Sequence, residues 1–235
     1  MRLIRATAAI LLAVGIAAPL HAFADPAWRI MVRPQKIELR RVMHAGSERT
    51  IYGYLFKSHV RNGALVVYGP GCNGADRAGR DYHVDHIKRL HAGGLDVLLL
   101  NSVSDRGLEE GGTCFIGDSD KRFVHTPMMA GDALAAVKWA RDNDYASQRI
   151  GYFGFSHGSR AGIWLAGEAS LRNVTPPELR PEKLGFATIV LVYPDCADWA
   201  RYAKGVGPLT TSLMIWGGHE ETFAGTVAWF NARLQ

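Results

Sequence analysis

Short apolar runs alternate with longer stretches of helical periodicity through most of this sequence, and no other feature constrains its fold as strongly. Residues 64–68 and 96–100 have the apolar character of strands that are buried on both faces of a sheet. Residues 127–143 place Ala130, Leu134 and Val137 at helical spacing along one side. Strands and helices that alternate in this way predict a mainly parallel sheet with helices on both faces, which is the α/β class.

The predicted strands span residues 37–42, 50–57, 64–68, 96–100, 149–155, 187–193 and 211–216, and the predicted helices span residues 81–91, 127–143, 159–169 and 222–234. The first two strands alternate polar and apolar residues through much of their length, which indicates an antiparallel pair. The 235 residues are enough for one α/β domain with a sizeable core.

Residues 150–158 carry the strongest local signal for chemistry: an apolar strand, then G-x-S-x-G, then a predicted helix. A serine on such a tight turn exposes its Oγ above the sheet edge, while the flanking glycines leave room for the turn. We therefore predict Ser156 as a nucleophile and the backbone N–H of His157 as an oxyanion donor. The His157 side chain is expected to point away from the Ser156 Oγ. The alternative is an ordinary strand-to-helix turn.

A second oxyanion donor should come from the loop that follows an earlier strand. The sequence Tyr-Gly-Pro-Gly-Cys-Asn-Gly at 68–74 lies in that place. Its glycines let the backbone amides turn inward, so the backbone N–H of Cys72 is the candidate partner of the His157 N–H. The alternative is a glycine-rich turn without a catalytic role.

These motifs resemble those of the dienelactone hydrolase-like group of α/β-hydrolases. The resemblance rests on G-P-G-C-N-G at 69–74, D-R-G at 105–107, G-F-S-H-G at 154–158 and W-G-G-H-E-E-T at 216–222. It implies an α/β-hydrolase fold and hydrolysis of a small ester or lactone through an acyl-enzyme on the serine. It also implies that no metal and no organic cofactor takes part.

The acid of the catalytic triad should follow the strand that ends at Trp216. Glu220 matches the family pattern best, although relatives more often have Asp there, and Glu221 is the neighbouring substitute. Asp195, which follows the preceding strand, is another position where such an acid can lie. A surface-loop role is the alternative for either glutamate.

The base is harder to assign, because the fold orders its triad as serine, acid and then histidine. None of the nine histidines follows Glu220. Our first interpretation is therefore an α/β-hydrolase fold that lacks the final strand and helix. A second is a degenerate, non-catalytic protein that keeps the pocket as a binding site. A third is that His219, oriented by Asp195, is the base.

The first 24 residues have the pattern of a signal peptide. Arg2 and Arg5 precede an uncharged apolar run at 6–20, and Ala22-Phe23-Ala24 fits the small-x-small cleavage pattern. A transmembrane anchor would need about 20 apolar residues, more than this run has. We predict an exported protein, periplasmic or secreted and without a membrane anchor after cleavage, in which residues 25–235 form a single α/β-hydrolase domain.

Cysteine and charge content bear on compartment and partners. The three cysteines are Cys72, Cys114 and Cys196, and none shows paired metal-site spacing. A Cys72–Cys114 bridge is one reading, and three buried small side chains are the other. Without residues 1–24 the chain has 25 basic and 22 acidic residues, a net charge of +3. Because the basic residues are scattered, we expect a small-molecule substrate and no nucleic acid. The sequence leaves the oligomeric state open.

Overall fold

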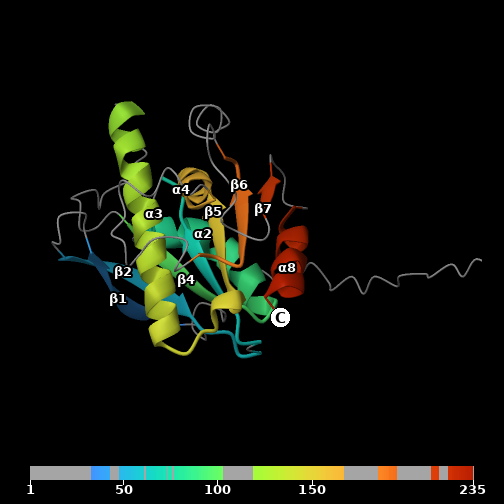
Figure 1. The fold of residues 1–235 in the computed structure, drawn as a ribbon. Coiled ribbons are helices and arrows are strands. Elements are labelled where there is room, and N and C mark those ends of the chain that lie inside the picture. The colour runs from blue at the N-terminus through green and yellow to red at the C-terminus, as the bar shows by residue number, and fades with distance from the viewer. Residues whose placement is uncertain are drawn as a thin grey trace, which may run out of the picture.

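The computed structural model describes residues 33–42, 48–60, 62–72, 74–75, 77–102, 119–166, 185–194, 213–216 and 222–234. Within these residues, seven strands form one sheet in the order β1-β2-β4-β3-β5-β6-β7 (Figure 1). The strands are β1 (Gln35–Val42), β2 (Glu48–Phe56), β3 (Leu65–Gly69), β4 (Asp96–Asn101), β5 (Ile150–Phe155), β6 (Thr188–Val192) and β7 (Leu213–Trp216). The N-terminal segment at 1–24, predicted as a signal peptide, lies outside the described residues.

The sheet is antiparallel at one edge and parallel through its centre. β1 pairs antiparallel with β2, and β2 with β4, whereas every pairing from β4 to β7 is parallel. Every residue of β3, β4, β5 and β6 is buried. The predicted antiparallel pair and the predicted mainly parallel sheet are both confirmed.

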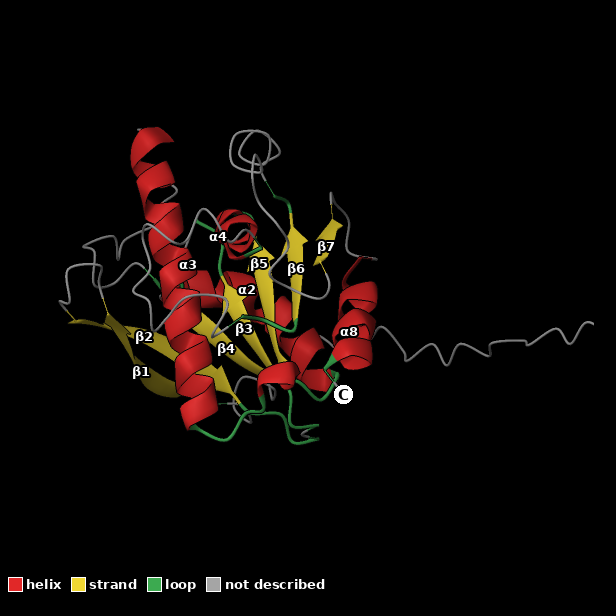
Figure 2. Ribbon diagram, viewed as in Figure 1, coloured by secondary structure: helices red, strands yellow, loops and turns green. Residues whose placement is uncertain are grey.

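Each face of the sheet buries its own apolar cluster, because successive side chains of a strand point to opposite faces. On β5, Tyr152 enters the first cluster, whereas Phe153 and Phe155 enter the second. Helices α3 (Ser119–Asp142) and α4 (His157–Leu165) pack on the first cluster, and α2 (Arg77–Ala92) and α8 (Thr222–Arg233) on the second. Helices therefore cover both faces, as predicted (Figure 2). A short 3-10 turn, η3 (Ser147–Arg149), leads into β5.

The side on which each helix lies follows the direction in which the chain crosses the sheet. α2 connects β3 to β4, toward the β1 edge, and lies on one face. α3 and α4 connect β4 to β5 and β5 to β6, toward the β7 edge, and lie on the other face. Right-handed crossovers require this division. α8 follows β7 but lies beside α2, on the face opposite to α3 and α4.

Several helix boundaries differ from the prediction: α2 begins at Arg77 and not at residue 81, and α4 ends at Leu165 and not at residue 169. α3 begins at Ser119 and contains Pro127, although we placed the start of the helix at the proline. Proline removes one backbone hydrogen bond from a helix, which made position 127 the expected boundary, but α3 continues through Pro127. Residues 129–140, which follow the proline, supply the core contacts of this helix. α4 begins at His157, directly after the motif serine, and not at Ser159.

A buried carboxylate joins three segments at the amino end of β4. Asp96 is 1% exposed, and one of its carboxylate oxygens accepts the Ser58 N–H at 2.8 Å. The other oxygen accepts the Tyr145 hydroxyl at 2.6 Å. Buried carboxylates are stable only when they are paired in this way. The network therefore fixes the end of the sheet opposite to the serine motif.

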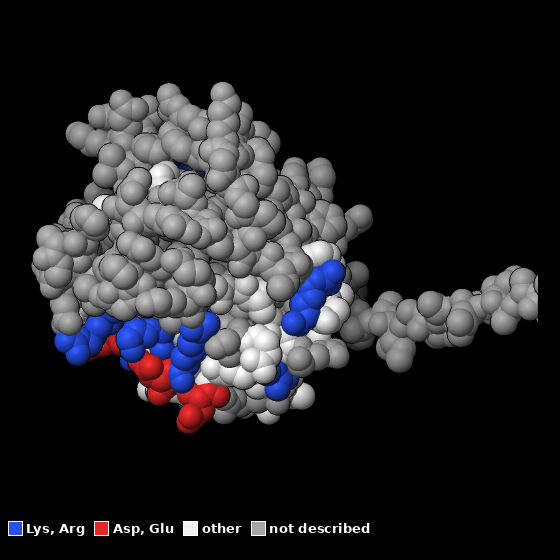
Figure 3. Space-filling model, in the orientation of Figure 1, with Lys and Arg blue, Asp and Glu red and all other residues white. Residues whose placement is uncertain are grey.

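Charges on the face drawn in Figure 3 are mixed in sign where the structure describes them. Lys and Arg side chains lie next to Asp and Glu along its lower left edge (Figure 3). Surface pairs of this kind include Lys138 with Asp142, one helical turn apart. Among the described helices, none is long and apolar enough to cross a membrane.

Candidate active site

Ser156 lies on a sharp turn between β5 and α4, at the carboxyl edge of the parallel strands. Its backbone has φ 50° and ψ −111°, a conformation that residues other than glycine seldom adopt. The Ser156 N–H donates to the Val192 carbonyl at 2.9 Å, which ties the turn to the end of β6. Its side chain is partly exposed and makes no capping hydrogen bond to α4. This is the strained turn that the serine motif predicted.

The two motif glycines are required by close backbone contacts. A Cβ atom on Gly154 would lie 2.6 Å from the carbonyl oxygen of Gly158. A Cβ atom on Gly158 would collide with the carbonyl oxygen of Gly69 and lie 2.8 Å from that of Pro70. The spacing G-x-S-x-G therefore lets the start of α4 approach both its own strand and the loop after β3.

Ser159, the second serine of the motif region, uses its hydroxyl in hydrogen bonds with the backbone. It is fully buried, and its hydroxyl lies 2.7 Å from the Gly154 carbonyl and 2.6 Å from the Val192 carbonyl. The hydroxyl also accepts the Val192 N–H at 3.1 Å. Ser159 therefore fastens α4 to β5 and β6, and Ser156 is the serine that faces outward.

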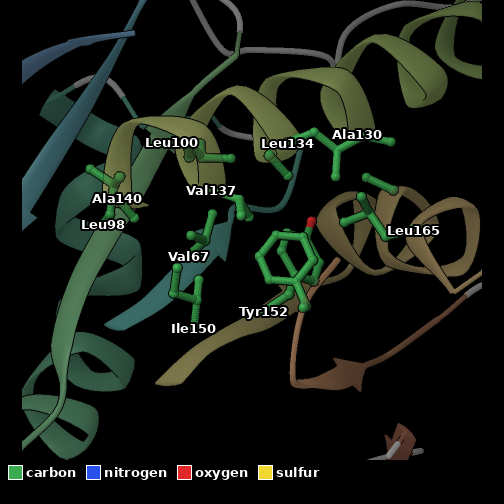
Figure 4. Close-up of a cluster of buried hydrophobic side chains, with 14 of the residues drawn as sticks. Val67, Leu98, Leu100, Ala130, Leu134, Val137, Ala140, Ile150, Tyr152 and Leu165 are labelled. Carbon is green, nitrogen blue, oxygen red and sulfur yellow. The ribbon is translucent and has the colours of Figure 1, made fainter. Parts of the chain in front are cut away.

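Tyr152 supports the turn from inside the apolar core. Its ring lies among side chains of β3, β4, α3 and α4, with the hydroxyl directed toward α4 (Figure 4). The hydroxyl donates to the Gly158 carbonyl at 2.8 Å. Burial, and next the nearby Asp132 carboxyl, raise the pKa of Tyr152 well above its usual value. The phenol therefore stays protonated and keeps this donor role.

The loop after β3 lies against the serine turn. Its residues 71–74 form a tight turn that is closed by the Gly74 N–H on the Gly71 carbonyl at 3.0 Å, with Gly74 at φ 71°. The contacts of Gly158 with Gly69 bring this loop against the start of α4. The two segments that carry the predicted oxyanion donors, Cys72 and His157, are therefore neighbours.

Cys72 is half-buried and disulfide-bonded. Its partner is one of the other two cysteines, Cys114 and Cys196, which both lie outside the described residues. The reading in which all three cysteines are reduced core residues is therefore wrong for Cys72. The predicted pairing with Cys114 stays a prediction.

The His157 side chain does not lie on the Oγ side of the turn. It is 5% exposed, and its Nε2 lies 3.4 Å from the Thr126 hydroxyl on α3. The imidazole therefore packs between α4 and α3, in agreement with the expectation that it points away from the nucleophile. His157 remains a candidate through its backbone N–H alone.

The remaining predicted triad residues lie outside the described residues. Asp195 follows β6 by three positions, and His219, Glu220 and Glu221 lie between β7 and α8. Parallel strands end at a common edge, and the described ends of β5, β6 and β7 all belong to it. The sequence positions of these residues are therefore compatible with a site beside Ser156.

The sequence did not predict a polar cluster beneath the loop after β3. The Tyr68 hydroxyl lies 2.6 Å from Nδ1 of His83 and 2.8 Å from Nδ1 of His86. We call these three residues the histidine–tyrosine cluster. A Cβ atom on Gly71 would lie 3.6 Å from the Ser156 Cβ and 3.8 Å from the His83 Cε1, so the cluster reaches the site. The i, i+3 spacing of the two histidines was the available signal.

Burial controls the protonation of both histidines. Desolvation, reinforced by the neighbouring His86, lowers the pKa of His83 to about 3. Desolvation also lowers the pKa of His86 to about 4, against an opposing effect of Asp85. Both rings are neutral at pH 7. The Tyr68 hydroxyl has one proton, so it donates to one Nδ1 and accepts from the other.

No group of His, Cys, Asp and Glu able to hold a metal ion occurs in the part of the chain that the structure describes. The polar groups placed at the site by the structure are hydroxyls, backbone amides and neutral imidazoles. Such groups suit acyl transfer, in which a hydroxyl attacks and amides receive the developing charge.

The arrangement of the elements is similar to that of solved esterases. The chain matches an esterase from Pyrococcus furiosus with a TM-score of 0.53 at 17% identity, over 88% of this chain and 95% of that one. It matches a cold-adapted esterase from an Arctic intertidal metagenomic library with a TM-score of 0.51 at 18% identity, over 87% of this chain and 95% of that one. A dienelactone hydrolase from Anabaena variabilis matches with a TM-score of 0.48 at 17% identity, over 86% and 100% of the two chains. No protein-family model matches the sequence, and no curated protein does.

Proposed function

We propose that this chain, which has the α/β-hydrolase fold, is a serine hydrolase that cleaves a small ester or lactone through an acyl-enzyme on Ser156. The observation that carries the proposal is the strained backbone of Ser156, which presents a serine hydroxyl at the carboxyl edge of the sheet. The structurally similar proteins are named esterases and a dienelactone hydrolase, which supports the same reaction class.

The reaction begins with attack of the Ser156 Oγ on the substrate carbonyl carbon, while a histidine takes the hydroxyl proton. The backbone N–H groups of Cys72 and His157 donate hydrogen bonds to the resulting oxyanion. Collapse of the tetrahedral intermediate breaks the ester bond, and the alcohol leaves with that proton. Water then attacks the acyl-serine by the reverse proton path and releases the carboxylic acid.

The position of α8 supports His219 as the base. A further parallel strand beyond β7 would need a crossover on the face of α3 and α4, because right-handed connections toward that edge lie there. α8 lies on the opposite face, beside α2, so it does not have the position of such a crossover. The segment between β7 and α8, which holds His219, is then the place for the base. Asp195 gives the required chain order of serine, acid and histidine.

Glu220 is the competing acid, and it would need a histidine later in the chain. The two assignments predict different mutants to be inactive. His219→Gln and Asp195→Asn abolish activity under the first assignment, whereas Glu220→Gln abolishes it under the second. Glu221→Gln tests the neighbouring substitute acid in the same way.

We further propose that the protein is exported to the periplasm or the cell exterior. The disulfide at Cys72 supports this location, because disulfides persist in oxidising compartments and are rare in the cytosol. Detection of the chain cleaved after Ala24 in an extracytoplasmic fraction would test the proposal. Recovery of the uncleaved chain from the cytosol alone would contradict it.

Labelling with a fluorophosphonate tests the proposed nucleophile. We expect stoichiometric labelling of the purified protein, complete loss in Ser156→Ala, and retention in Ser159→Ala if that variant stays folded. Hydrolysis of a short-chain ester should follow the same pattern. Absence of labelling in a folded, monodisperse sample would refute the serine hydrolase and favour a non-catalytic protein that only binds its ligand.

A further inference from the structure

Tyr193 combines an unfavourable backbone with an exposed ring. It directly follows β6, at the edge of the sheet where the parallel strands end, and has φ 56°. Aromatic residues seldom occupy this left-handed region. The proline at 194 further disfavours helical backbone angles for the residue before it, which is Tyr193. The side chain is nevertheless 49% exposed. The fold thus holds a large ring in solvent at a cost in backbone energy, a pattern that is concentrated at functional sites.

The position of Tyr193 is fixed relative to the proposed nucleophile. The preceding residue, Val192, accepts the Ser156 N–H at 2.9 Å and exchanges hydrogen bonds with the Ser159 hydroxyl. The backbone of Tyr193 is therefore attached to the turn that carries Ser156. Among the described residues the other large exposed apolar side chain is Val60, which is hydrogen-bonded to Ser58 near the amino end of β4, at the opposite end of the sheet.

Phe155 supports the Tyr193 ring from behind. The two rings meet edge to face, with centroids 5.6 Å apart and an interplanar angle of 86°. Phe155 is itself 9% exposed. Its ring centroid lies 4.9 Å from that of His86 and 5.7 Å from that of His83. The histidine–tyrosine cluster thus fixes Phe155, and Phe155 fixes one edge of the Tyr193 ring. The remainder of Tyr193 accounts for its 49% exposure, and its backbone is one residue from the Val192 carbonyl that holds the Ser156 turn.

We infer that Tyr193 is a specificity-determining residue that binds a planar aromatic group of the substrate, next to the scissile ester bond. The inference rests on the proposed function and narrows it to aryl or aroyl esters. A fixed, half-exposed aromatic face favours another aromatic ring over a saturated ring of equal size, because stacked or edge-to-face rings gain energy beyond area burial. The strained backbone sets the ring in place before the substrate binds, which lowers the ordering cost of binding.

Two substrate pairs test the inference on either side of the ester. Phenyl acetate and cyclohexyl acetate differ in the alcohol, and methyl benzoate and methyl cyclohexanecarboxylate differ in the acid. For each pair, the ratio of kcat/KM values is compared between wild type and variant, so that intrinsic reactivity cancels. In Tyr193→Ala we expect the ratio in at least one pair to fall by about 3- to 10-fold. Tyr193→Phe keeps the ring and should leave the same ratio within about 2-fold.

A third variant and a labelling rate separate the outcomes. Tyr193→Asn removes the ring but suits the left-handed backbone, so it should lower the ratio even if Tyr193→Ala does not fold. The rate of labelling by a small ethyl fluorophosphonate should be unchanged in all three variants. If the wild type is not labelled, the proposed function fails. If labelling is intact and neither ratio falls in the Ala or Asn variant, the inference about Tyr193 alone is overturned.

Discussion

Acidification should destabilise this protein through His83. The folded-state pKa of His83 is lowered to about 3, whereas the unfolded chain has the ordinary value of 6.5. The unfolded state therefore binds the proton first, and stability that is present above pH 6.5 is lost as the pH falls toward 3. Each pH unit in this interval costs about 1.4 kcal/mol. At pH 5 the loss from His83 alone is about 2 kcal/mol.

His86 adds to this loss in the same direction. The pKa of His86 is lowered to about 4. Because the ring is only partly buried and Asp85 lies nearby, we take half of the stability loss that this pKa shift would give at pH 5, about 1 kcal/mol. Both rings share the Tyr68 hydroxyl, so their protonation is coupled. The cluster should lower the free energy of unfolding by about 3 kcal/mol between pH 7.5 and pH 5, a large part of the stability of a typical domain.

Urea unfolding at pH 7.5 and at pH 5 measures this effect. His83→Gln removes the titrating ring and keeps an acceptor for Tyr68, so we expect its loss of stability on acidification to be smaller than that of the wild type by about 2 kcal/mol. Lys138→Gln changes an exposed residue of α3, on the opposite face of the sheet from His83, and serves as the control with an expected wild-type response. Equal pH responses of the wild type and His83→Gln would refute the reasoning.

Three further predictions follow from close contacts. Gly158→Ala should abolish fluorophosphonate labelling and cost about 3 kcal/mol of stability, because the new methyl group meets the backbone of the loop after β3. Gly71→Ala is the control and should stay folded, because the nearest atom to its methyl group would lie at 3.4 Å. In urea titrations, Asp96→Ala should lower the free energy of unfolding by about 3 kcal/mol, because it leaves two buried donors unsatisfied. Tyr145→Phe leaves one buried acceptor unsatisfied and should cost about 2 kcal/mol. Equal losses in the two variants would contradict this ranking. Cys72→Ser should cost about 2–4 kcal/mol, and dithiothreitol should lower the melting temperature of the wild type but not of the variant.

Hydrophobic periodicity predicted most of the fold because the strands at the centre of the sheet, β3 to β6, are short, wholly buried runs. Residues 64–68 were expected as a strand, and β3 spans Leu65–Gly69. The face on which α8 packs was beyond the sequence, since an amphipathic stripe shows that a helix buries one side and not which face of a sheet receives it. The face on which α8 packs matters for the proposed function, because it favours His219 over a later histidine as the base.

The features of the candidate site that depend on nearby residues could also be predicted from the sequence, whereas those that depend on distant segments could not. The strained turn at Ser156 follows from a short motif, because the glycines and the serine act within five residues of one another. The histidine–tyrosine cluster depends on β3 and α2 meeting in space, with Tyr68 and His83 fifteen positions apart. The backbone of Tyr193 has no signal in its residue type, since an aromatic residue is among the least expected at positive φ.

The hydrogen bond from Tyr152 to the Gly158 carbonyl has an evolutionary consequence. Tyr152 lies deep in the cluster beneath α3 and α4, so the shape of the serine turn depends on residues that no substrate contacts. Under the proposed function, selection on activity would therefore extend into the interior, where conservative changes around this phenol would alter the turnover of every substrate alike. If Tyr193 binds the substrate as inferred above, changes at this residue would alter the choice among substrates and spare the turn. Divergence of specificity in this fold is thus expected to run through the loops at the carboxyl edge, while the packing behind Ser156 stays nearly constant.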